Sequence, residues 1–118
     1  MLSARNRFFG QKGIKRVLKY GKISRGRFLS IKTIENNRRS GSRVAVVVSK
    51  KVSKKAVVRN RIRRRIYEIF RKNWDKIEPN KDIVVLVYDE KTAILPHVEL
   101  ETSILQLAEK AKLLTNRN

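Results

Sequence analysis

The residues best suited to chemistry form one basic segment, residues 50–65, in which nine of sixteen positions are Lys or Arg. Guanidinium groups bind phosphate oxygens through paired hydrogen bonds, so the segment favours a phosphate-bearing partner. Val58 and Ile62 begin an apolar stripe that repeats every three or four residues as far as Phe70. A disordered basic tail needs no such stripe, whereas a helix packed on a core does. The segment therefore predicts a helix over residues 55–74 with its cations pointing outward.

The candidate phosphate-binding residues belong to this helix and to the loop of residues 50–54 before it. Free amide groups at the start of the helix add to the positive potential there. The candidates are Lys50, Lys51, Lys54, Lys55, Arg59, Asn60, Arg61, Arg63 and Arg64. At 100° per residue, Asn60, Arg64 and Tyr67 fall opposite the apolar stripe. So many like charges repel one another along a helix, which favours an anionic partner over a merely solvated surface.

The acidic residues and the one histidine offer little for catalysis. The chain has no Cys and a single His, His97, which removes cysteine zinc sites and most nucleophile–base pairs. Asp89 and Glu90 form the one close acidic pair beside a strand end, and a metal-dependent nuclease acting alone would need more converging carboxylates. We therefore predict no catalytic residue in this chain, and we assign no metal ligand.

The charge of the 118-residue chain is concentrated in one half. The net charge is +20, and residues 1–65 contribute +21 while residues 66–118 contribute −1. Such a field favours a polyanion bound by the first half. The apolar runs are too short to span a bilayer, and the stripe of the basic helix is needed by the core, so a membrane partner is disfavoured. Signatures of DNA-binding folds are absent, which leaves RNA as the preferred partner.

Hydrophobic periodicity predicts a single domain over residues 1–118 without linkers or repeats. Two Val-rich or Ile-rich segments before the basic helix are expected to pair as a hairpin. The expected elements are an extended or flexible arm at 1–10, a helix at 11–20, strands at 27–34 and 43–49, the helix at 55–74, a strand at 82–88 and a helix beginning at Pro96.

An RNA-binding groove is predicted beside the sheet, because single-stranded RNA binds apolar or aromatic platforms flanked by cations. Ile14 and Leu18 form an apolar face on the first expected helix, and Phe28 and Ile31 lie on the first expected strand. These four side chains are candidates for the groove. Core packing is an equally good interpretation for Phe28.

Three short motifs resemble the protein subunit family of bacterial ribonuclease P. They are Ser49-Lys50-Lys51-Val52, Ala56-Val57-Val58 and Arg59-Asn60-Arg61-Ile62-Arg63-Arg64. The resemblance implies an α/β (α+β) two-layer sandwich, in which a small mixed sheet is packed by three helices in the order helix-strand-strand-helix-strand-helix. It also implies a strand-helix-strand crossover of the unusual left hand.

The resemblance further implies a division of labour between protein and RNA. The arginine-rich helix would contact the catalytic RNA, and a cleft formed by the sheet and the first helix would bind the 5′ leader of precursor tRNA, with Lys51 nearby. The RNA subunit, with bound magnesium, would cut the phosphodiester bond, so that the protein is a non-catalytic subunit of an endoribonuclease. No membrane or obligate protein partner is expected, and the expected compartment is the cytoplasm.

Some positions depart from the family pattern. Ile14, Leu18 and Ile31 stand where many relatives place aromatic residues, so contact with a leader would be apolar there. Tyr67 stands where an Arg is common. A structural ribosomal RNA-binding protein fits the size and composition equally well and is the alternative interpretation; the Arg59-Asn60-Arg61 context argues against it.

Overall fold

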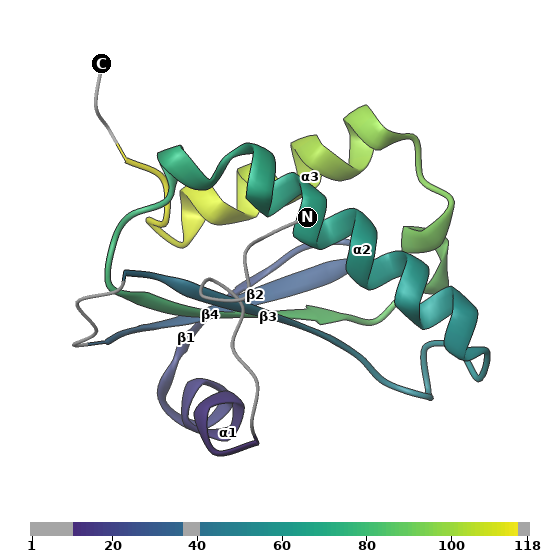
Figure 1. The fold of residues 1–118 in the computed structure, drawn as a ribbon, viewed down its shortest axis with the longest axis horizontal. Coiled ribbons are helices and arrows are strands. Elements are labelled where there is room, and N and C mark those ends of the chain that lie inside the picture. The colour runs from purple at the N-terminus through teal and green to yellow at the C-terminus, as the bar shows by residue number, and fades with distance from the viewer. Residues whose placement is uncertain (1–10, 37–40, 116–118) are drawn as a thin grey trace.

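Four strands form one mixed sheet in the order β1-β2-β4-β3 (Figure 1). The structure is a computed structural model and describes residues 11–36 and 41–115. The strands are β1 (Lys22–Arg25), β2 (Leu29–Glu35), β3 (Arg43–Val48) and β4 (Lys81–Val87). Strand β2 pairs antiparallel with both β1 and β4, whereas β3 pairs parallel with β4. The expected arm at residues 1–10 lies outside the described residues.

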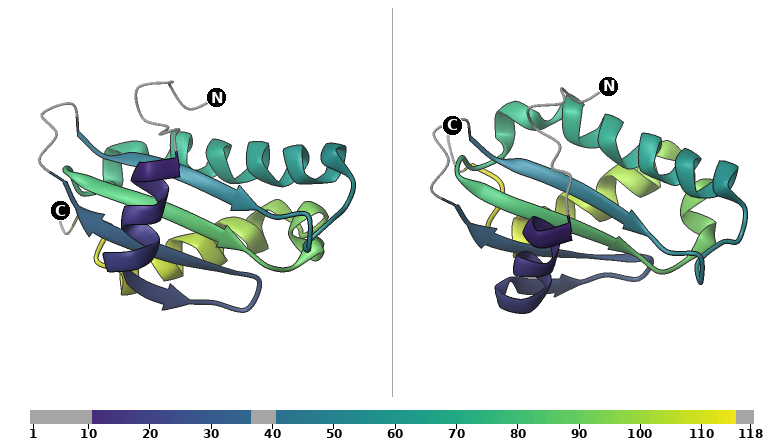
Figure 2. Two further views of the ribbon diagram at one scale, coloured as in Figure 1. Left: turned by 90° about the horizontal axis from the view of Figure 1, so that it is seen from below. Right: turned by 60° about the horizontal axis from the view of Figure 1, so that its bottom comes forward.

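Three helices cover the two faces of the sheet unequally (Figures 1 and 2). They are α1 (Gln11–Tyr20), α2 (Ala56–Lys72) and α3 (His97–Lys110), with short 3₁₀ helices η2 (Trp74–Lys76) and η3 (Glu90–Ala93). Helices α2 and α3 form a layer on one face, and α1 alone crosses part of the other face. The expected fold class, a mixed sheet with three helices, is confirmed.

Alternation along the strands divides their side chains between two apolar clusters. In β4, Ile83, Val85 and Val87 face the large core under α2 and α3, whereas Val84 faces α1. The smaller cluster joins Val84 to Val17 of α1 and to Ala45 of β3. Strand β4 is thus buried on both faces, which explains its continuous run of branched apolar residues.

The pairing of the strands differs from the expected hairpin. Strands β2 and β3 do not pair, because β4 lies between them. The hairpin instead joins β2 to β1, a four-residue strand that the sequence analysis did not predict. Strand β1 is largely exposed and lacks a hydrophobic pattern, so alternation could not indicate it. Gly26 closes this hairpin, since a Cβ there would lie 2.8 Å from a Leu107 side-chain carbon and 2.9 Å from the Leu29 carbonyl oxygen.

The connection from β3 through α2 to β4 is left-handed (Figure 2), as the family resemblance implied. Crossovers between parallel strands are nearly always right-handed. The helices otherwise follow the expected ranges closely, and α3 begins directly after Pro96. Within residues 11–36 and 41–115, no helix is long and apolar enough to cross a bilayer.

A buried ion pair joins β3 to β4. Both oxygens of Asp82, which is 2% exposed, accept hydrogen bonds from Arg43, at 2.9 Å from Nε and 2.7 Å from Nη2. Asn36 Nδ2 donates to Oδ1 of the same carboxylate at 2.7 Å. Burial by itself would raise the pKa of Asp82, but these hydrogen bonds and the charges of Arg43 and Arg16 lower that pKa overall.

We expect Asp82→Asn to lower the free energy of unfolding by about 3 kcal/mol at pH 7, because it leaves Arg43 without its charged partner. The folded pKa lies below the unfolded value of about 3.9, so the native carboxylate stabilises the protein above that pH. This contribution is lost as the pH falls through the folded pKa. Urea unfolding between pH 7 and pH 3 should show a shallower loss of stability in the variant; an equal loss in both proteins would contradict the assignment.

Candidate nucleic-acid interface

Helix α2 presents its cations because its apolar stripe is fully committed to the core. Ile62, Ile66, Ile69 and Phe70 are each at most 2% exposed. The Phe70 ring meets Trp74 edge to face, with centroids 6.4 Å apart. This packing fixes the rotation of the helix, so the remaining side chains must point toward solvent or along the helix borders.

The loop before α2 is held by a small hydrogen-bond network centred on Ser53. The Ser53 hydroxyl accepts from the Lys55 amide at 3.3 Å and donates to Glu90 at 3.3 Å. The Ser53 carbonyl accepts from Arg59 Nη1 at 2.9 Å. No side chain caps the helix and no acid lies in its first turn, so its positive end is not neutralised from within. The four lysines that surround this end are exposed: Lys50, Lys51, Lys54 and Lys55.

The arginines of α2 divide into two groups by their hydrogen bonds. Arg59 and Arg63 bind within the protein, the latter through Asn60 Oδ1 at 2.7 Å and the Val48 carbonyl at 3.5 Å. Arg61 and Arg64 are exposed and have no hydrogen-bond partner within the described part of the chain. The second group therefore has all its donors available for an anion.

Arg65 fastens α2 to the segment that follows β4. Its guanidinium donates to the Thr92 carbonyl at 2.7 Å and to the Leu95 carbonyl. Burial, together with the charge of Arg61, lowers its pKa from the ordinary value. Arg65 was not among the candidate binding residues, and the structure gives it the role of a clamp rather than a free cation.

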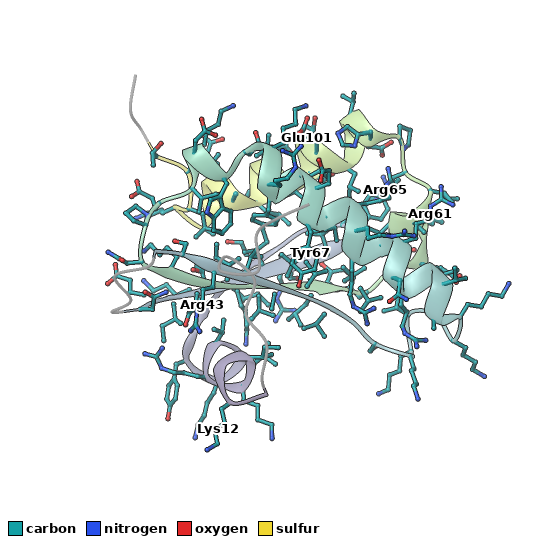
Figure 3. All side chains as sticks on the ribbon, viewed as in Figure 1. Lys12, Arg43, Arg61, Arg65, Tyr67 and Glu101 are labelled. Atoms are coloured by element: carbon teal, nitrogen blue, oxygen red, sulfur yellow. The ribbon has the colours of Figure 1, made fainter. Side chains whose placement is uncertain are left out.

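The predicted position of Tyr67 is wrong. Tyr67 packs against the large core, and its hydroxyl oxygen accepts a hydrogen bond from the Val46 amide at 3.1 Å (Figure 3). Strand β3 is at the edge of the sheet, so this side chain pairs with part of an edge that no other described strand covers. A helical projection placed Tyr67 opposite the stripe because it ignored the reach of a long side chain toward a neighbouring strand.

The last turns of α2 carry less free charge than the first. Arg71 donates to Glu68 Oε1 from Nε at 2.7 Å and from Nη2 at 2.5 Å, and these hydrogen bonds lower the pKa of Glu68 to about 2. Lys72 lies 3.7 Å from Glu101 of α3. Because both cations have acidic partners, the available positive surface is concentrated in the first half of α2 and the loop before it.

A second surface is the part of the sheet that α1 leaves uncovered. Ile14 and Leu18 of α1 are half-buried against this face, as are Val47 and Leu86 of the strands. Tyr88 continues the alternation of β4 and is 48% exposed. Because β3 leads directly into the loop before α2, this apolar face adjoins the basic loop that carries Lys51.

One predicted groove residue lies elsewhere. Ile31 is fully buried in the large core, on the sheet face opposite α1, so its placement beside Ile14 and Leu18 is wrong. Phe28 lies just before β2 and is 7% exposed, with the Arg27 guanidinium 5.1 Å from its ring centroid. Its carbonyl accepts a hydrogen bond from the Tyr88 amide at 3.1 Å, and its place in the groove stays a prediction. Tyr88 was missed, although the alternation of Val84 and Leu86 along β4 could have indicated it.

The acidic pair has structural hydrogen bonds. Asp89 caps η3 by accepting from the Lys91 amide at 2.8 Å, and Glu90 accepts from Ser53. Within residues 11–36 and 41–115, no three His, Cys, Asp or Glu residues are grouped as metal ligands. His97 is exposed and begins α3 directly after Pro96, which occupies the cap position.

Comparison with known proteins identifies the same family throughout. The family model described as ribonuclease P matches residues 2–112. The ribonuclease P protein component of Pseudanabaena sp. is 36% identical over 115 residues, covering 97% of both chains. The ribonuclease P protein of Staphylococcus aureus superposes with a TM-score of 0.79 at 27% identity, covering 93% of this chain and 98% of that one. That of Thermotoga maritima gives a TM-score of 0.78 at 25% identity, covering 88% and 96%.

The clamp residue Arg65 and the exposed Arg64 should respond differently to truncation. Arg65→Ala removes two charge-assisted hydrogen bonds to backbone carbonyls and should lower the free energy of unfolding by about 2 kcal/mol. Arg64→Ala removes an exposed side chain of the same type and should change that free energy by no more than about 0.5 kcal/mol. Thermal and urea unfolding of both variants test the distinction. Equal stability losses would show that Arg65 is not a clamp.

Proposed function

The chain belongs to the ribonuclease P protein family, and we propose that it binds the catalytic RNA of ribonuclease P through α2 and the basic loop before it. It acts as the protein component of this enzyme in tRNA processing. The observation that carries the proposed binding surface is a pair of exposed arginines, Arg61 and Arg64, which have no hydrogen-bond partner among the described residues, on a helix whose Ile62, Ile66, Ile69 and Phe70 are buried. Phosphate groups of RNA complement such guanidinium groups in charge and geometry.

We propose further that the 5′ leader of precursor tRNA lies across the uncovered sheet face. Leu18, Val47 and Leu86 offer an apolar surface there, and Tyr88 adds an exposed ring on which a base can stack. Lys51 lies in the loop that adjoins this face and can bind a leader phosphate. The two surfaces together would place the leader beside the catalytic RNA.

Cleavage itself we assign to the RNA subunit. The described carboxylates do not converge on a common point, and Asp89 and Glu90 are engaged in hydrogen bonds of their own. The described residues therefore do not fit a protein-held magnesium site, and we propose that magnesium is held mainly by RNA phosphates. We also propose that the protein acts in the cytoplasm, with catalytic RNA and precursor tRNA as its partners and without an obligate protein partner.

The decisive test is single-turnover cleavage of a precursor tRNA at low magnesium concentration. The reaction is run with a bacterial ribonuclease P RNA, with this protein, and with both together. We expect stimulation over the RNA-only reaction when the two are combined, and no cleavage by the protein freed of RNA. Cleavage by the protein alone would contradict the RNA-based mechanism. Tight RNA binding without stimulation would instead favour a ribosomal RNA-binding protein.

Arg61→Ala/Arg64→Ala should weaken binding to ribonuclease P RNA while leaving thermal stability nearly unchanged. Each phosphate contact contributes about −0.7 to −0.9 to the slope of log affinity against log salt concentration, so the slope should become shallower by about 1.4 to 1.8. Filter binding at salt concentrations between about 50 and 400 mM measures the affinity and its salt slope. Thermal unfolding measures the stability. Lys76→Ala/Lys91→Ala removes the same charge from exposed positions outside α2 and serves as the control.

A further inference from the structure

A groove runs along the β1 edge of the sheet, between α3 and the β1–β2 hairpin, and the last residue of α1 also contributes to its wall. It consists of two cavities, of about 610 Å³ and 360 Å³, that share Lys110 in their walls. The larger cavity reaches Lys22 and Lys112, and the smaller one reaches Arg25 and Phe28. We call this feature the β1–α3 groove. Strand β1 is the edge of the sheet, so the groove is separate from α2, which lies near the β3 edge (Figure 2).

The walls of the groove are strongly basic. Lys22, Arg25, Lys110 and Lys112 are exposed, and none has an acidic partner within the described residues. The single acid in the walls, Glu35, is paired with Lys81 at 3.3 Å. Cations that are close together and unpaired raise the affinity of a concave surface for anions. The groove thus gathers positive charge from β1 and from the end of α3, which are far apart in the sequence.

Lys112 lies in a backbone conformation that favours glycine. Its φ is 58°, in the left-handed region, and it lies two residues beyond the last residue of α3. The Leu113 amide that follows donates to the Ala108 carbonyl at 2.8 Å, which closes the helix end. Glycine is the usual residue at such a helix end because it has no Cβ to strain the conformation. A lysine here is unfavourable for the helix end, but it places a cation in the wall of the larger cavity.

Two further side chains in the larger cavity point to the nature of its occupant. The Thr33 hydroxyl is buried and has no hydrogen-bond partner within the described residues, which is uncommon for a buried polar group. Tyr20 is 64% exposed beside the lysines of this cavity, and the Lys19 ammonium lies 5.3 Å from its ring centroid. A nucleotide can bind such a combination, with its base stacked on the exposed ring and its phosphate at the cations.

We propose that the β1–α3 groove binds the phosphodiester backbone of an RNA strand, as a site separate from α2 and from the uncovered sheet face. The strand would run from the hairpin toward the end of α3, with phosphates near Lys22, Lys110 and Lys112 and a base against Tyr20. The identification of the RNA rests on the proposed function. Both the catalytic RNA and precursor tRNA present this backbone, and the experiment distinguishes them.

The test measures binding of the full chain to two separate probes, a bacterial ribonuclease P RNA and a leader-bearing precursor tRNA. Lys22→Ala/Lys110→Ala removes two groove cations, and Lys76→Ala/Lys91→Ala removes two exposed lysines that line neither cavity. We expect the groove variant to weaken binding to at least one probe several-fold more than the control variant, and to make the salt slope shallower by about 1.4 to 1.8 for that probe. The affected probe identifies which RNA occupies the groove.

Lys112→Gly separates binding from folding. Glycine fits the left-handed conformation, so the melting temperature should stay equal or rise, while RNA affinity should fall. If Lys112→Gly and the groove variant bind both RNAs as the control variant does, the proposal is wrong. Loss of binding to polyglutamate without loss of binding to RNA would also overturn it, in favour of an acidic protein segment.

The Arg61→Ala/Arg64→Ala variant, measured in the same assay, keeps the two proposals distinguishable. If that variant loses affinity and the groove variant does not, only the groove proposal fails. If the unaltered protein binds neither probe, the proposed function itself fails.

Discussion

The packing of α2 on the sheet is the constraint on which the rest of the structure depends. Burying Ile62, Ile66, Ile69 and Phe70 fixes the rotation of the helix, and a helix so rich in arginine can then place its charges only along its borders and on its outer side. Arginines next to the stripe reach backbone carbonyls and hold neighbouring segments. Those farther from it have no such carbonyl within reach, so they remain available to an anion. The packing of this one apolar stripe thus separates the arginines that stabilise the fold from those that can bind an anion.

The sheet adds a second surface because its two faces are covered unequally. Strand β4 occupies an inner position and is joined to β3 by the Arg43–Asp82 pair as well as by the strand hydrogen bonds. Helix α1 covers only part of one face (Figure 2). The uncovered part lies where β3 and β4 end, and β3 continues directly into the basic loop before α2. The apolar face and the cationic surface therefore adjoin as a consequence of chain connectivity.

The distribution of charge in the folded protein differs from its distribution along the chain. Residues 66–118 have a net charge of −1, which indicated that the basic first half alone would bind an anion. In the structure, however, several acids of the second half have partners of their own: Glu68 and Glu101 pair with cations, and Glu90 accepts a hydrogen bond from Ser53. Lys110 and Lys112 have no acidic partner among the described residues, and they line the β1–α3 groove together with Lys22 and Arg25 of β1. A second basic surface arises from both halves together.

The sequence by itself determined the helices, the family resemblance and most of the cationic surface, because these depend on residues close together in the chain. Periodicity over three or four residues identified the buried stripe of α2, and the bounds of α1 and α2 followed from local signals. Only the tertiary structure decided which strands pair, because β4 is inserted between β2 and β3 from a distant part of the chain. Alternation likewise shows that Ile31 and Lys32 face opposite sides of the sheet, but it cannot show which side α1 covers. The side that α1 covers depends on how whole elements pack together. The same packing places the Tyr67 hydroxyl at the edge of β3 and places α3 beside β1.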